Sequence, residues 1–381
     1  MIKKIFPFLF FFLTILIFFL VFDFVVSKNT NLFEIRKDCF DYVKIEKEKK
    51  RYYTYFLSKN CHAFEHKGTT PSYKVYTDNN GNRYFKNKKE KNLNPKVIFL
   101  GDSFAYGFGL NYNESIPGII SNKVSKDYDV LNFSVPGYSP SMNHYKLKKY
   151  LENNKNIKIS KIIYLLDLTD VHDEANRWKN IKSIKEPVIA DQAIEKEIKK
   201  SFEFKKNFRA TRFFIYHINN YTRNFKKLIK KKFFEKDSTS VDIEGTYWGS
   251  FTHTSQNQLL KNQFYLNLWK NDFKFGLTKI NRNIKKIAKL SEEHDAEFYI
   301  SIHPWRETIE LGQTYFNWEK YSEELCNLSN CKKTINFFDK VREIKEKNIN
   351  WKTKLYFKKD LHFNREGNQL YSEKIFSEAF K

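Results

Sequence analysis

The chain lacks the signatures by which most nucleic-acid-binding proteins are recognised. It contains no RNP, zinc-finger or helix-turn-helix motif, although 68 Lys and Arg against 44 Asp and Glu give a net charge of +24. The excess is mostly Lys and is spread along a chain that is also rich in Asn, Ile, Phe and Tyr. A basic balance alone suits an anionic membrane or an acidic polymer equally well. We therefore expect no nucleic-acid partner.

Cysteine is scarce, and its placement favours local disulfides over a metal site. Cys39 and Cys61 flank one short segment, while Cys326 and Cys331 close a C-x4-C loop. A structural zinc site needs closely spaced cysteine pairs or clustered His, and these two pairs lie far apart in the sequence. We expect two disulfides, which persist outside the cytoplasm, and neither metal nor other cofactor.

A long apolar run lies at the N-terminus. Residues 5–26 are almost wholly apolar, which is enough to cross a bilayer core of about 30 Å. Lys3 and Lys4 precede this run, so residues 1–4 are predicted to be cytoplasmic and the chain after Ser27 to lie on the periplasmic or extracellular side. A cleaved signal peptide is the alternative, but its apolar core usually spans roughly 7 to 15 residues and an A-x-A-like site follows it. We therefore favour an uncleaved transmembrane signal anchor in the cytoplasmic membrane.

The remainder divides by its hydrophobic pattern. Residues 27–94 are polar and aromatic, with a turn signal at Asn79-Asn80-Gly81-Asn82, and are interpreted as a juxtamembrane segment ending in a hairpin. A basic stretch at about 178–275 is interpreted as a helical insertion, with a solvated Lys face favoured over a lipid-binding one. Short apolar runs typical of buried parallel strands alternate with candidate helices, and they lie at 97–100, 130–133, 162–168 and 298–302. This alternation predicts an α/β domain over residues 95–381, a doubly wound parallel sheet interrupted by the insertion.

Two short segments carry the residue types of nucleophilic catalysis. Gly101-Asp102-Ser103-Phe104 follows the first predicted strand, where ligands of doubly wound sheets bind. Asp360-Leu361-His362 precedes the predicted C-terminal helix. A serine hydroxyl needs a base to take its proton, and that base needs an orienting carboxylate. Each segment alone is more often a turn or a helix cap, but together they predict the triad Ser103, His362 and Asp360.

These segments resemble the conserved blocks of the SGNH/GDSL hydrolase superfamily. Residues 97–104 match the apolar strand and G-D-S-[FL] turn, residues 132–139 are similar to an N-x-[GS]-x-x-G stretch, and residues 360–367 look like a D-x-H-x-N-x-x-G variant of D-x-x-H. Gly81-Asn82-Arg83 resembles a lead-in found in membrane-associated members. The resemblance implies a three-layer, flavodoxin-like fold. It also implies an oxyanion hole formed by the backbone amides of Ser103 and Gly137.

The third block departs from the family pattern. Thr169 stands where the family has an oxyanion-binding Asn, so its shorter hydroxyl is the remaining side-chain candidate for that role. Losing one oxyanion donor typically costs about 100- to 1,000-fold in rate. His172 is either a compensating group or an ordinary loop residue. Asp102 and His303, which also follow predicted strands, are further candidates for the pocket.

The resemblance implies a serine esterase or deacetylase, or an O-acyltransferase, working through an acyl-serine. For an anchored domain outside the cytoplasm, the expected substrate is an acylated carbohydrate of the envelope or cell surface. The protein would act on this substrate alone or together with the machinery that makes envelope polysaccharide. Two alternatives remain. One is a non-catalytic scaffold that binds glycan or an envelope assembly partner, which the missing Asn favours. The other is an anionic-polymer or lipid-binding protein that uses the basic insertion.

Overall fold

The computed structural model describes most of the chain, in two compact units. One unit comprises residues 1–36 and 192–240, and the other comprises residues 37–191 and 241–381. The described residues are 2–29, 38–47, 50–65, 69–85, 94–179, 263–313 and 316–381. Most of the predicted insertion at 178–275 therefore lies outside the described residues.

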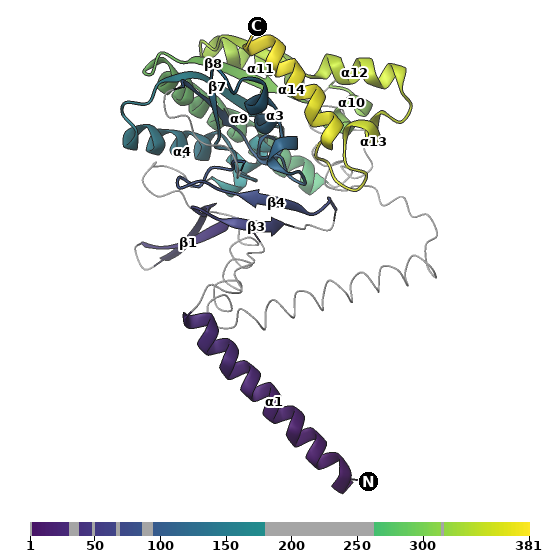
Figure 1. Ribbon diagram of the computed structural model, residues 1–381. Coiled ribbons are helices and arrows are strands. Elements are labelled where there is room, and N and C mark those ends of the chain that lie inside the picture. The colour runs from purple at the N-terminus through teal and green to yellow at the C-terminus, as the bar shows by residue number, and fades with distance from the viewer. Residues whose placement is uncertain are drawn as a thin grey trace. The chain divides into compact units, whose positions relative to one another are not determined.

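In the first unit the structure describes a single element, helix α1 (Ile2–Asn29), drawn in purple in Figure 1. Within the described parts of the chain, no helix qualifies as long and apolar enough to cross a membrane.

The second unit is built on a five-stranded parallel sheet, as the sequence pattern predicts. Its strand order is β6-β5-β7-β8-β9, which is the 2-1-3-4-5 order of flavodoxin-like folds. The three central strands carry apolar runs because helices cover both faces of a parallel sheet, whereas the edge strand Lys333–Asn336 has the sequence KTIN. Their bounds are β5 (Lys96–Leu100), β6 (Asp129–Asn132), β7 (Ile159–Leu166), β8 (Glu297–Ile302) and β9 (Lys333–Asn336). The order reverses between β5 and β7, so this is where a ligand site is expected.

Helices complete the three layers (Figure 1). Helices α3 (Ile116–Lys123) and α14 (Arg365–Ala379) pack against each other, and α9 (Gln263–Glu292) packs against both α4 (Pro140–Asn153) and α11 (Trp318–Leu328). Ile280, Ile284 and Ile287 on α9 are fully buried, as their helical spacing predicts. Helix α9 begins at Gln263, so the last part of the predicted insertion belongs to a helix of the α/β domain.

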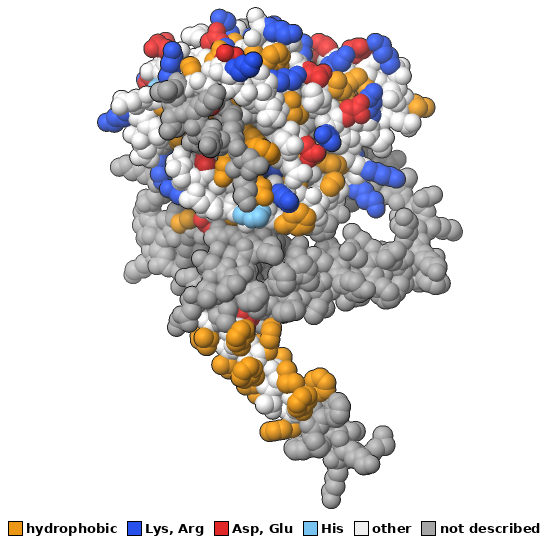
Figure 2. Space-filling view, in the orientation of Figure 1, with side chains coloured by type: hydrophobic (Ala, Val, Ile, Leu, Met, Phe, Trp, Pro, Cys, Tyr) orange, Lys and Arg blue, Asp and Glu red, His pale blue; other side chains and the backbone are white. Residues whose placement is uncertain are grey.

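Shorter helices follow the strands or join the later elements. They are α2 (Ser103–Tyr106), α5 (Thr169–His172), α10 (Arg306–Leu311), α12 (Phe338–Lys347) and α13 (Trp351–Leu355). Two further helical turns are the 3-10 helix Tyr112–Glu114 and the π-helix Asp173–Arg177. On the face that Figure 2 shows, basic and acidic side chains are interspersed over the upper part of the molecule, where α12 and α14 lie.

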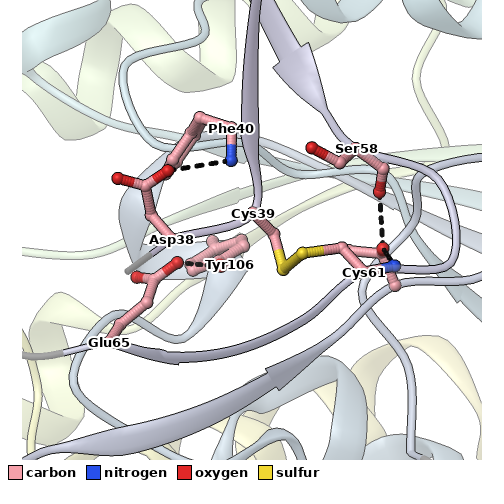
Figure 3. The surroundings of a disulfide bond; sticks show 8 residues. Asp38, Cys39, Phe40, Ser58, Cys61, Glu65 and Tyr106 are labelled. Atoms are coloured by element: carbon pink, nitrogen blue, oxygen red, sulfur yellow. Dashed lines mark hydrogen bonds between the residues drawn. A yellow bond between two sulfur atoms is a disulfide. The ribbon is translucent and has the colours of Figure 1, made fainter. Parts of the chain in front are cut away.

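Two antiparallel hairpins precede the sheet. One pairs β1 (Phe40–Lys47) with β2 (Lys50–Leu57), and the other pairs β3 (His62–Glu65) with β4 (Tyr73–Tyr76). A disulfide between Cys39 and Cys61 links the two hairpins, with Glu65 and Tyr106 beside it (Figure 3). The second disulfide joins Cys326 to Cys331, so both bonds connect the cysteines that the sequence pairs.

These hairpins lie in the same compact unit as the parallel sheet. The hydroxyl of Tyr55 on β2 donates to the carbonyl of Pro136 at 2.9 Å, and the hydroxyl of Tyr138 donates back to the Tyr55 carbonyl at 2.8 Å. Strand β2 therefore packs against the turn that follows β6, at the carboxyl-terminal edge of the sheet. These contacts join residues that are far apart in the sequence, so no local sequence pattern predicts them.

Arg83 also connects this part of the chain to the rest of the α/β unit, and its side chain is buried. Its side chain is 1% exposed and its guanidinium donates to the carbonyls of Tyr106, at 2.5 Å, Gly107, at 2.9 Å, and Leu110. The guanidinium also lies over the Tyr106 ring, 4.6 Å from the centroid. One cation thus satisfies the carbonyls of the loop that follows α2, the helix that begins at Ser103.

Candidate active site

Ser103 occupies a tight turn at the end of β5. Gly101 has a φ of +150°, and a Cβ there would lie 2.9 Å from both the Leu165 carbonyl oxygen and Ala105 Cβ, so glycine is required. Asp102 caps α2, because its Oδ1 accepts from the amide of Phe104 at 2.9 Å. Ser103 is then the first residue of α2, and its side chain remains partly exposed.

His362 and Asp360 reach Ser103 from the loop between α13 and α14. The distance from Ser103 Oγ to His362 Nε2 is 2.7 Å, and that from His362 Nδ1 to Asp360 Oδ1 is 2.5 Å. The loop is fixed by a β-bridge between Tyr356 and Phe363 and by the Phe357 amide, which donates to the His362 carbonyl at 3.0 Å. Ser103, His362 and Asp360 thus form one chain of hydrogen bonds, although Ser103 and His362 are 259 residues apart in the sequence.

The surroundings keep Asp360 ionised and hold the imidazole in place. Burial by itself raises the pKa of Asp360, but the hydrogen bond and charge of His362, followed by a hydrogen bond from Thr69, bring this pKa below its ordinary value. The rings of Phe104 and Phe108 flank the His362 ring at centroid distances of 4.8 and 4.6 Å. Thr69 and Phe108 were not predicted from the sequence, since neither lies in a recognisable motif.

Gly137 lies in the turn after β6, with a φ of +74°. Its carbonyl accepts from Arg177 Nη1 at 3.1 Å and from Trp178 Nε1 at 2.8 Å. A Cβ at this position would lie 2.0 Å from Arg177 Nη1, so a side chain would displace the arginine. The Gly137 amide, which the resemblance assigns to the oxyanion hole, belongs to the preceding peptide, whose Pro136 carbonyl accepts from the Tyr55 hydroxyl at 2.9 Å.

Thr169 begins α5, directly beyond β7, but its hydroxyl already has an acceptor. Both the backbone amide, at 2.8 Å, and the side-chain hydroxyl of Thr169 donate to Asp167 Oδ1. Asp102 Oδ2 lies 3.4 Å from the same hydroxyl. A hydroxyl has one proton, so donation to Asp167 leaves none for a substrate oxygen. This geometry does not favour the oxyanion role suggested for Thr169.

Asp167 is the centre of a buried polar network. Its Oδ2 accepts from Trp305 Nε1 at 2.7 Å and lies 3.1 Å from His303 Nε2. Burial raises the pKa of Asp167, but His303, then Thr169 and Trp305, lower it below its ordinary value. For Asp102, burial and next the charge of Asp167 raise the pKa well above its ordinary value. Asp102 therefore retains its proton over a range in which Asp167 is ionised.

The structure places the two further candidate histidines differently from the sequence expectation. His303 follows β8 but is fully buried, and its ring centroid lies 4.1 Å from that of Phe104. It therefore packs against a residue of the site and does not line an open pocket. His172 ends α5, where its Nδ1 lies 3.6 Å from Asp173 Oδ1. Among the described residues, no group of His, Cys, Asp and Glu side chains is arranged to hold a metal ion.

Comparisons with known proteins found similar solved structures of low sequence identity. No family model matches the chain, and no curated protein matches its sequence. The esterase EstA from Pseudoalteromonas sp. is 13% identical, with 74% of this chain and 96% of that chain covered and a TM-score of 0.38. A lipolytic protein of the G-D-S-L family from Veillonella parvula is 10% identical, with 75% and 98% covered and a TM-score of 0.40. The acetylxylan esterase Axe2 from Geobacillus stearothermophilus is 8% identical, with 76% and 97% covered and a TM-score of 0.41.

The chain's own fold and site define its class. It is an α/β protein with a 2-1-3-4-5 parallel sheet and a Ser-His-Asp arrangement at the carboxyl ends of the strands. What the site does is inferred below from its residues.

Proposed function

We propose that this chain is a serine hydrolase that cleaves ester bonds through an acyl-serine intermediate. The observation that carries the proposal is the 2.7 Å contact between Ser103 Oγ and His362 Nε2, in a chain that continues to Asp360. His362 takes the proton of Ser103 as its Oγ attacks the ester carbonyl, and then donates it to the departing alkoxide. Asp360 orients the imidazole and stabilises its charged form.

The backbone amides of Ser103 and Gly137 are the proposed donors to the oxyanion that forms during this attack. Backbone donors are held before the reaction begins, so they stabilise the developing charge without reorganisation. Water then attacks the acyl-serine, with His362 as base, and releases the acid. If a sugar hydroxyl takes the place of water, the same steps transfer the acyl group and make the protein an O-acyltransferase.

We further propose that the substrate is an ester of a carbohydrate outside the cytoplasm. The two disulfides support this location, because such bonds persist in oxidising compartments. The envelope or cell-surface glycan, and any polysaccharide machinery working with it, remain part of this proposal.

The test compares the purified full-length chain with Ser103→Ala on a short-chain nitrophenyl ester and on O-acetylated oligosaccharides. We expect saturable hydrolysis by the wild type and background rates for the variant, because the nucleophile is absent. Released acetate identifies an esterase, while acetyl groups found on an added sugar acceptor identify a transferase. Equal background rates for both proteins, with glycan binding retained, would support the non-catalytic scaffold that the occupied Thr169 hydroxyl favours.

A further inference from the structure

A residue of the N-terminal hairpin region contacts the carboxylate of the triad. Thr69 lies between β3 and β4, 291 residues before Asp360, and its hydroxyl donates to Asp360 Oδ2 at 2.6 Å. Neither the resemblance nor any local motif singles out this threonine. Its contact links the loop between β3 and β4 to the catalytic groups.

This contact completes the bonding of the carboxylate. Asp360 Oδ1 accepts from the backbone amide of His362 at 3.1 Å and from its ring Nδ1 at 2.5 Å. Oδ2 points the other way and accepts from Thr69. With a donor on each oxygen, the carboxylate cannot rotate about its terminal bond without breaking a hydrogen bond. Its angle to the imidazole is therefore fixed from both sides.

The position of Thr69 is itself fixed by neighbouring contacts. Thr70 is 6% exposed and packs so closely on Gly109 that a Cβ there would lie 2.8 Å from Thr70 Cβ. On the β3 side, Glu65 is 1% exposed and accepts from the hydroxyl of Tyr73 at 2.5 Å. The hydroxyl of Tyr106, on α2, also donates to Glu65 at 3.4 Å. The hairpin is thus tied to the same helix that presents Ser103.

We propose that Thr69 is a positioning residue that holds the Asp360 carboxylate in register with His362. The inference rests on the proposed serine-hydrolase function. It assigns the hairpins a role in the site, since without them Asp360 would have a donor on one oxygen only. Thr69 acts through Asp360 and does not touch the reacting atoms.

The test uses three variants of the full-length chain. Thr69→Val keeps the shape of the side chain but removes the donor, and we expect kcat/KM on a nitrophenyl ester to fall about tenfold, mainly in kcat, as for a lost hydrogen bond to a charged group. Thr69→Ser retains the donor and should restore most of the rate. Thr70→Val is the matched control, because the buried Thr70 hydroxyl has no hydrogen-bond partner among the described residues, and it should keep the wild-type rate.

A second readout does not depend on turnover. The charged side chain that faces Asp360 is His362, and its charge, with the Thr69 bond, holds the pKa of Asp360 below the ordinary value. The carboxylate form is therefore lost only as pH falls through this lowered pKa, and removing one donor raises that pKa. We expect ¹³C NMR of the Asp360 carboxyl, assigned with Asp360→Asn, to titrate at higher pH in Thr69→Val than in the wild type, Thr69→Ser or Thr70→Val.

The two readouts separate the inference from the proposed function. An unchanged titration of Asp360 in a folded Thr69→Val protein would overturn the positioning role, whatever the rates. Equal losses of rate in Thr69→Val and Thr70→Val would also overturn it, because they would reflect loosening of the hairpin. A shifted titration in a protein that hydrolyses no ester would uphold the contact and instead refute the proposed function.

Discussion

Replacing Thr169 with valine tests how the oxyanion hole of this protein differs from the family pattern. Valine is nearly isosteric with threonine, so the change removes the hydroxyl and little else. In the structure that hydroxyl and the Thr169 amide both donate to the buried carboxylate of Asp167. Removing a donor from a buried charged acceptor should lower the free energy of unfolding by about 1 to 3 kcal/mol. The rate, in contrast, should fall less than about tenfold, because no substrate contact is lost.

The assay pairs urea denaturation with steady-state hydrolysis of a nitrophenyl ester. Thr308→Val is a suitable control for stability, since the buried Thr308 hydroxyl has no hydrogen-bond partner among the described residues. If Thr169 donates to the oxyanion instead, Thr169→Val should lose about 100- to 1,000-fold in rate with stability nearly unchanged. That result would refute the assignment of the hydroxyl to Asp167. Thr169→Asn, which introduces the amide of the family pattern, should raise the rate if the amide reaches the substrate.

Three further predictions concern stability. Arg83→Met should lower the free energy of unfolding in urea by about 3 kcal/mol or more, because three backbone carbonyls lose a buried donor; a loss below 1 kcal/mol would contradict this. Burial lowers the pKa of His144 to about 4, so between pH 4 and pH 7 the unfolded chain binds a proton that the folded chain does not. The free energy of unfolding should therefore rise by roughly 3 kcal/mol from pH 4 to pH 7. His144→Gln should lack this rise, and an unchanged dependence of its stability on pH would refute the assignment. Replacing Cys39 and Cys61 by Ser removes a disulfide between residues that are 22 positions apart in the sequence. This change should lower the free energy of unfolding by about 3 kcal/mol and reduce activity, which thermal unfolding and ester hydrolysis would measure.

The sheet and the triad could be predicted because their signals are local. The three central strands β5, β7 and β8 carry apolar runs, and a strand buried on both faces can be recognised from such a run alone. The triad residues lie in short blocks at strand and helix ends, where turn geometry restricts the residue types. Gly101, which no other residue can replace in its turn, is one example.

The parts that the sequence did not reveal depend on contacts between distant segments. The sequence identifies Arg83 only as part of the Gly81-Asn82-Arg83 stretch and does not single out Thr69 at all, because their contacts with Tyr106 and Asp360 exist only in the folded chain. The packing of the two N-terminal hairpins could not be predicted for the same reason, since polar, aromatic hairpins carry no pattern that shows what they pack against. His303 was placed correctly after a strand, but its burial behind Phe104 follows from side-chain packing alone.

The reactivity of Ser103 tests the central claim most directly. The full-length chain is treated with a fluorophosphonate, which phosphonylates activated serines, and the modified peptide is identified by mass spectrometry. We predict a single adduct on Ser103 that is absent from Ser103→Ala and strongly reduced in His362→Gln, because the imidazole 2.7 Å away activates the hydroxyl. A folded wild-type protein that acquires no adduct on Ser103, or acquires it equally in His362→Gln, would contradict the account.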